Sequence, residues 1–88
     1  MPFRIDTAEV EATTLISVQG QLLGDAVAQL EMVSRNARDP RVVDLALLQT
    51  ADAEGIGALV TLAGEGVELL NASPYIELLI ERKRTNGE

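Results

Sequence analysis

Alternation of apolar and polar positions marks the beginning of the chain as β-structure. Residues 3–10 read FRIDTAEV, and residues 14–19 read TLISVQ with Ile16 and Val18 on one face. Successive side chains of a strand point to opposite faces of a sheet, so each run offers one face for burial. Because only residues 11–13 connect the two runs, we expect an antiparallel hairpin.

Helical spacing of apolar residues begins after the hairpin. Gly24 and Asp25 open the predicted helix, since aspartate caps helices well and suits their positive N-terminal end. Asp39-Pro40 ends it, because a residue before proline avoids helical geometry. Apolar residues three or four positions apart form its predicted buried face: Ala26, Leu30, Val33 and Ala37.

The middle of the chain is predicted to form a strand, a helix and a second strand. Residues 42–48 (VVDLALL) are mostly apolar, as in a strand covered on both faces. The stretch TADAEGIGALV follows at residues 50–60, and a second helix is expected to begin near Asp52 and to end near Gly64–Gly66. Residues 67–71 (VELLN) then read as another strand.

Ser73-Pro74 marks the start of a third helix, because a hydroxyl cap followed by proline suits the first turn. This helix is predicted over residues 74–83, with residues 85–88 as a disordered tail. Its predicted buried side chains are Ile76, Leu79 and Ile80. The order β-β-α-β-α-β-α predicts a single α/β domain over residues 1–88, with a mixed sheet of about four strands and about three helices.

The residue types that are absent narrow the chemistry of the chain. It has no Cys and no His, which excludes thiol chemistry, His-based metal sites and an imidazole base. The net charge is −7, and only Arg82, Lys83 and Arg84 cluster, where cations offset the dipole of the last helix. Nucleic-acid binding is therefore not expected. No run approaches the roughly 20 apolar residues of a membrane span, and no signal peptide is recognisable, so we expect a cytoplasmic protein without membrane insertion.

The stretch at residues 50–60 is the strongest candidate for a functional site. Asp52 can cap the second helix, and Glu54 lies in its first turn, where the helix dipole favours a carboxylate. A phosphate cradle is disfavoured, because Val60 stands where the third glycine of G-x-G-x-x-G belongs. Two carboxylates without further ligands make a poor metal site, and catalysis is not expected without a histidine base. We therefore expect neither a metal nor a cofactor.

Four short motifs lie in order along the chain: Gly20-Gln21-Leu22, Asp44-Leu45, Asp52-Ala53-Glu54-Gly55-Ile56-Gly57 and Ser73-Pro74. In this order and spacing they resemble the STAS family, the domain of sulfate transporters and of bacterial anti-sigma factor antagonists. The likeness extends over roughly residues 3–83. It implies a STAS-like fold and a partner-binding edge at the loop and helix around Asp52–Gly57.

The resemblance also shows where this chain departs from the family. In its antagonists, the residue after the motif aspartate is a Ser or Thr that a partner kinase phosphorylates. That position is Ala53 here, whose methyl group has no oxygen to phosphorylate, and Thr50 lies off the matching position. Gln21 and Leu23 replace the family's acidic residues near the end of the second strand. The resemblance does not extend to the phosphorylation switch, and whether Glu54 imitates a phosphorylated state stays open.

The second helix has too few polar residues for an exposed outer face. Between Ile56 and Ala63 only Thr61 is polar, so Ala58 and Leu62, which are predicted to point away from the sheet, would be exposed. A helix that is apolar all round is normally covered on both sides, which predicts that a partner chain or a second copy covers this one. The predicted partner-binding residues are Asp52, Ala53, Glu54, Gly55, Ile56, Gly57, Ala58, Leu62 and Met32.

The expected function is a non-catalytic protein-interaction module, similar to anti-sigma factor antagonists, whose partner is an anti-sigma kinase or a similar regulator. Two alternatives stay open. One is a cytoplasmic STAS subunit of an ABC-type lipid or anion transport complex, and the other is a nucleotide- or metabolite-sensing domain. A homodimer also stays open.

Overall fold

β1 (Phe3–Val10) and β2 (Thr13–Leu22) form the antiparallel hairpin that the alternation predicts. The computed structural model describes residues 3–86, within which the chain forms five strands and three helices. Glu11 and Ala12 alone connect the hairpin, with φ angles of 53° and 69°. Positive φ at both residues of a two-residue turn matches the right-handed twist of the paired strands.

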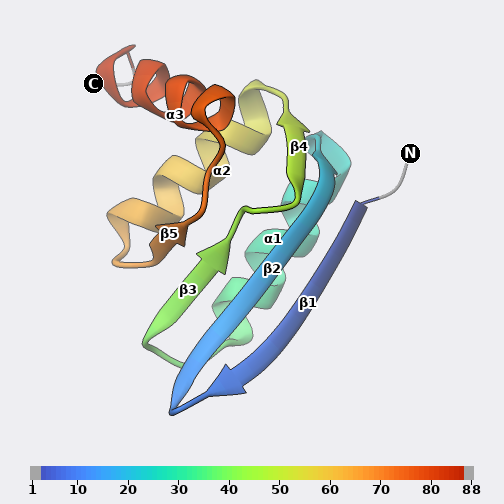
Figure 1. Cartoon of the computed structure of the whole chain (residues 1–88), viewed down its shortest axis with the longest axis vertical. Coiled ribbons are helices and arrows are strands. Elements are labelled where there is room, and N and C mark those ends of the chain that lie inside the picture. The colour runs from blue at the N-terminus through green and yellow to red at the C-terminus, as the bar shows by residue number, and fades with distance from the viewer. Residues whose placement is uncertain (1–2, 87–88) are drawn as a thin grey trace.

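β2 is the centre of a mixed sheet (Figure 1). β1 pairs with one side of it in antiparallel orientation, and β3 (Arg41–Asp44) and β4 (Leu48–Ala51) pair with its other side in parallel orientation. β5 (Glu68–Leu70), shorter than the predicted strand at residues 67–71, lies parallel to β3. The register of β2 against β4 shifts after Gly20, whose φ of 90° costs glycine little. The sheet has the mixed orientation that the sequence predicts, with one strand more than expected.

The predicted strand over residues 42–48 is wrong in one respect, because the structure divides it into β3 and β4. Asp44 ends β3, and its Oδ1 accepts a hydrogen bond from Ala46 N at 2.9 Å. Leu48 N donates to Leu45 O at 3.1 Å and closes the turn. An aspartate that bonds the backbone two residues further on can form such a turn inside an apolar run. The observed order is therefore β-β-α-β-β-α-β-α.

α1 (Gly24–Asn36), α2 (Ala53–Gly64) and α3 (Pro74–Asn86) form the helical layer. Figure 1 shows α1 behind β1 and β2, and α2 packs against both α1 and α3. No helix within residues 3–86 is long and apolar enough to cross a membrane. The sheet and the helices enclose an aliphatic core, whose fully buried members include Ile16, Val18, Leu22, Leu30, Val43, Leu45, Leu59 and Ile76.

The buried face of α1 includes a polar residue that the apolar spacing did not predict. Two of the four predicted positions are buried, Ala26 and Leu30, and two are half-buried, Val33 and Ala37. Ser34 is almost fully buried as well. Arg41 Nη1 donates to Ser34 Oγ at 2.8 Å and to Ser34 O at 2.9 Å. A polar side chain is tolerated in a core when it is hydrogen-bonded in this way.

α3 begins where Ser73-Pro74 predicts, and Ser73 Oγ accepts a hydrogen bond from Ile76 N at 3.2 Å. Of its predicted buried side chains, Ile76 and Ile80 are buried and Leu79 is half-buried. The helix runs to Asn86. Disorder of the tail at residues 85–88 stays a prediction: α3 includes residues 85–86, and residues 87–88 lie outside the described part of the chain.

Candidate functional site

The hexapeptide Asp52–Gly57 lies at a strand-to-helix turn, as the sequence predicts. β4 ends at Ala51, Asp52 is the N-cap residue with extended backbone angles, and α2 begins at Ala53. The backbone N–H of Asp52 donates to Leu22 O at 3.2 Å, which ties the turn to the end of β2. The turn is therefore anchored to the central strand of the sheet.

The carboxylate of Asp52 caps two helices at once. Its Oδ1 accepts a hydrogen bond from Gly55 N at 2.8 Å in α2, and its Oδ2 accepts one from Gly24 N at 3.0 Å in α1. The predicted cap at Asp25 is wrong, because the N-cap residue of α1 is Leu23 and Asp25 lies exposed in the first turn. Leucine has no side-chain oxygen to accept a backbone hydrogen bond. Asp52 supplies the missing acceptor from across the fold and joins the beginnings of α1 and α2.

Glu54 also faces the beginning of α1. Its Oε1 occupies the space that a Cβ atom on Gly24 would need, with Asp52 Oδ2 close by. A carboxylate at this place interacts favourably with the positive N-terminal ends of helices. Because both motif carboxylates turn toward α1, the residue between them, Ala53, is left as the exposed apolar group of the turn.

The two glycines of the motif have different surroundings. A Cβ atom on Gly55 would collide with the backbone carbonyl oxygen of Leu22, so the absence of a side chain lets α2 approach β2. A Cβ atom on Gly57 would have only Lys83 Cε nearby, at 3.6 Å, which is ordinary van der Waals contact. The absence of a side chain is therefore needed for packing against the sheet at Gly55 and not at Gly57.

The predicted exposure of Ala58 and Leu62 is wrong. Their exposed fractions are 6% and 5%, and both line a hollow between α1 and α2. The prediction assumed that only the sheet covers α2, whereas α1 and α3 flank it and cover its sides. Gly55 and Ile56 are buried too. The apolar circumference of α2 is thus explained within the chain, and no partner is needed to cover it.

The remaining predicted positions are scattered. Met32 is exposed on α1, about two turns beyond Gly24, the residue of α1 that Asp52 contacts. Thr50, the weak candidate for phosphorylation, is half-buried in β4 and pairs with Gln21 of β2. Of the predicted set, the structure places Ala53 and Glu54 at the exposed start of α2.

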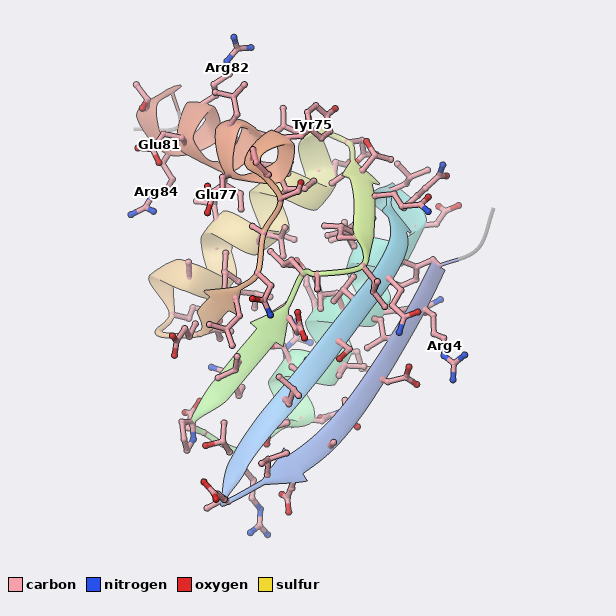
Figure 2. The ribbon with its side chains drawn as sticks, in the orientation of Figure 1. Arg4, Tyr75, Glu77, Glu81, Arg82 and Arg84 are labelled. Carbon is pink, nitrogen blue, oxygen red and sulfur yellow. The ribbon has the colours of Figure 1, made fainter. Side chains whose placement is uncertain are left out.

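The structure adds residues of α3 that the sequence did not associate with the motif. They help to line an open, shallow surface hollow of about 430 Å³, here called the α2–α3 hollow, formed by Ala51, Asp52, Ala53, Ile56, Leu79, Arg82 and Lys83. Tyr75 and Leu78 of α3 are also half exposed. Figure 2 shows Tyr75 and Arg82 on α3, with Arg82 projecting outward from the helix. About thirty residues separate Ala53 from Arg82 along the chain, and no local pattern predicts that α2 and α3 lie side by side.

The described residues do not assemble a metal site. Within residues 3–86, no group of three or more Asp or Glu side chains lies close enough together to hold a metal ion. The two motif carboxylates are turned toward α1, with Asp52 accepting two backbone hydrogen bonds. Asp52 thus acts as a helix cap, and Glu54 is an acidic residue in the first turn of α2.

Comparison with known proteins gives structural matches only. No protein-family model matches the sequence, and no curated protein matches it. An anti-sigma factor antagonist STAS domain from Rhodobacter sphaeroides superposes with a TM-score of 0.64 at 20% identity, over 82% of this chain and 92% of that chain. The anti-sigma factor antagonist SpoIIAA, in its unphosphorylated form, gives a TM-score of 0.66 at 21% identity, over 91% and 82%.

A third structure extends the same likeness. An uncharacterised protein from Shewanella loihica with a SpoIIAA-like fold gives a TM-score of 0.57 at 11% identity, over 94% of this chain and 77% of that chain. Identities this low carry information about the fold and not about the site. The chain therefore has the α/β fold of the STAS domain that these anti-sigma factor antagonists share.

Proposed function

We propose that this chain is a non-catalytic, cytoplasmic STAS-like interaction module that binds a partner protein through the surface at the start of α2. The proposal rests on one observation: neighbouring residues of the turn have different surroundings, some packed within the fold and one exposed. Asp52 and Glu54 face α1, Gly55 faces β2, and Ala53 remains exposed beside the α2–α3 hollow. A rigid turn that presents a small side chain beside a hollow is suited to docking, because little order is lost on binding.

The proposal includes the absence of phosphate control at this position. Ala53 has no hydroxyl group, and the carboxylate of the exposed residue Glu54 lies against Gly24 of α1. The module would then bind its partner without being switched there. Incubation with the partner kinase and ATP, followed by mass spectrometry, should find no phosphate on residues 50–57. A phosphate on Thr50 would contradict this part of the proposal.

We propose that the chain is not an enzyme, because the side chains that could act in catalysis are either missing from the sequence or already hydrogen-bonded within the fold. The sequence has no His and no Cys, and the Asp52 carboxylate already accepts two backbone hydrogen bonds. A general acid or base needs to be within reach of a substrate proton. The α2–α3 hollow contains no other carboxylate than that of Asp52.

Docking is tested with a substitution that adds bulk to the exposed position without reaching the core. Wild-type protein and Ala53→Arg are used as bait in lysate of the native cell, and captured proteins are quantified by mass spectrometry. We expect Ala53→Arg to lower capture of the specific partner by about tenfold, equivalent to about 1.4 kcal/mol. Ala8→Arg, at an exposed position of β1, is the matched control and should retain capture. Full retention by a folded Ala53→Arg protein would contradict the proposal.

The identity of the captured partner separates the alternatives. A sigma-factor regulator would support the antagonist-like role, whereas a transport ATPase would favour the alternative of a transport-complex subunit. A thermal shift of the purified protein with GTP or ATP would favour the nucleotide-sensing alternative, because a ligand that binds only the folded state raises its stability.

A further inference from the structure

The α2–α3 hollow has an apolar floor of limited size. Ala51 and Ile56 are buried beneath it, Leu79 is half-buried at its side, and Ala53 is exposed at its edge. Its volume of about 430 Å³ is near the lower end of the roughly 300–1,000 Å³ that ligand pockets occupy. These dimensions suit a large apolar side chain that anchors a partner.

Arg82 and Lys83 give the hollow a basic rim, although the net charge of the whole chain is negative. Arg82, Lys83 and Arg84 are three of only seven basic residues in a chain of net charge −7. All three are exposed, and the ion pairs found among residues 3–86 use Arg4 and Arg41 instead. A cluster of one sign on a surface of the other sign attracts oppositely charged groups and disfavours like-charged partners.

Lys83 extends the basic rim across α2. Its Cε lies 3.6 Å from the place of a Cβ on Gly57, and it also lines a second hollow on the other side, which Arg84 shares. Carboxylates do lie near this charge, because Asp52 lines the α2–α3 hollow with Arg82 and Lys83, and Glu31 and Glu54 line the second hollow with Lys83 and Arg84. The ion pairs found among residues 3–86 nevertheless involve none of these basic side chains. Arg82 and Lys83 are therefore available to a bound partner.

The outer side of α3 continues the surface away from the hollow. Tyr75, Leu78 and Arg82 are spaced by three and four residues and so lie along one helical stripe. Tyr75 and Leu78 are 53% and 52% exposed, and Tyr75 and Arg82 can be followed along α3 in Figure 2. Tyrosine and arginine are enriched where proteins bind one another.

From these observations we infer that the partner presents an acidic protein segment, whose apolar anchor enters the α2–α3 hollow while its carboxylates pair with Arg82 and Lys83. The inference rests on the proposed function and adds the chemistry of the partner. An anionic membrane is disfavoured, because segments that bind anionic lipids carry roughly 4–8 clustered Lys and Arg residues, whereas Arg82, Lys83 and Arg84 are the only clustered basic residues of this sequence. A segment with an apolar side chain flanked by carboxylates matches both the apolar floor and the basic rim of the hollow.

The experiment uses a photo-crosslinking amino acid, p-benzoylphenylalanine, placed in turn at Tyr75, at Leu78 and, as a distant control, at Val10 in the hairpin. The full chain is expressed in its native cell, and the crosslinked peptides are sequenced by mass spectrometry. We expect the variants at Tyr75 and Leu78 to capture the same partner segment, with an excess of Asp and Glu around an apolar residue, and the variant at Val10 not to capture it. A captured segment without acidic excess would overturn the inference.

Charge reversal then tests the basic rim itself. Arg82→Glu/Lys83→Glu should lower the crosslink at Tyr75 by at least about tenfold. Arg35→Glu/Arg38→Glu, with the same change in net charge at exposed positions elsewhere, should change it by less than about twofold. Circular dichroism of both variants confirms folding. Equal crosslinking in both variants would overturn the inference.

The outcomes separate this inference from the proposed function. A crosslink at Tyr75 that charge reversal does not change leaves the docking function intact and removes the acidic partner. A crosslink at Tyr75 that Ala53→Arg does not lower counts against the docking function itself. Flotation with phosphatidylserine vesicles tests the remaining source of negative charge, and binding that Arg82→Glu/Lys83→Glu abolishes would overturn the inference in favour of a lipid surface.

Discussion

The two sides of the first turns of α2 differ in how tightly their residues are packed against the rest of the fold. On the inner side, Asp52 bonds to two helix starts and Gly55 lies against the Leu22 carbonyl oxygen. On the outer side, Ala53 is exposed beside the α2–α3 hollow, and Gly57 has room for a methyl group. The difference shows that neighbouring motif residues can serve opposite purposes, with one set fixing the fold and the other left free to contact a partner.

Gly55→Ala should lower the stability of the protein most, because it disrupts the packing of the inner side of α2 against β2. The added methyl group would overlap the carbonyl oxygen of Leu22, and a backbone oxygen cannot move aside as a flexible side chain can. α2 would have to shift away from β2, and we expect a loss of about 3 kcal/mol of unfolding free energy or more. Urea unfolding followed by circular dichroism measures it. Wild-type stability in Gly55→Ala would refute the close approach of helix and strand.

Asp52→Ala should have the next largest effect, because one side chain serves two helices. Removing an N-cap costs about 1 kcal/mol, so the loss of both hydrogen bonds, to Gly55 N and Gly24 N, should cost about 2 kcal/mol. Asp52→Asn is the graded control, since its single amide oxygen can satisfy only one of the two N–H groups. It should lose about half as much in the same urea unfolding. Equal stability of the Ala and Asn variants would argue against the double cap.

The elements of the fold that the sequence predicts well depend on local chemistry. Side-chain alternation marks the hairpin, and the caps at Asp52 and Ser73 mark two helix starts, because each signal lies within a few residues. The break between β3 and β4 was missed although it is also local, because the Asp44 side chain turns the backbone inside a run that is otherwise apolar.

The parts that the sequence does not predict depend on which elements become neighbours. Leu62 is buried because α1 and α3 flank α2, and Ser34 is buried because Arg41 reaches it from β3. The position of Arg82 beside Ala53 also follows from the packing of α2 against α3. For the candidate site, the turn and its exposed residues Ala53 and Glu54 follow from the sequence, whereas the predicted exposure of Ala58 and Leu62 is wrong.

Gly57→Ala should have a smaller effect of opposite sign, which sharpens the contrast between the two glycines. The new methyl group meets only Lys83 Cε at 3.6 Å, and replacing glycine by alanine inside a helix gains up to about 1 kcal/mol. We expect Gly57→Ala to raise the urea midpoint without a change in the slope of the transition. A destabilised Gly57→Ala protein would mean that the outer side of α2 is as tightly packed as the inner side.

Glu54→Gln should have the smallest effect on stability. It tests whether Glu54 stabilises the start of α1 or contributes to partner binding. Its carboxylate lies against Gly24 at the start of α1, so removal of the charge should cost no more than about 0.5 kcal/mol, and less at high salt, because helix-dipole interactions are screened. Partner capture should remain at the wild-type level, because the side chain faces α1. If Glu54 instead acted as a permanent substitute for a phosphate group, Glu54→Gln would change capture strongly while leaving stability almost unaltered. Measuring urea unfolding at two salt concentrations together with capture separates the two roles, because a helix-capping carboxylate changes only stability and a phosphate substitute changes only binding.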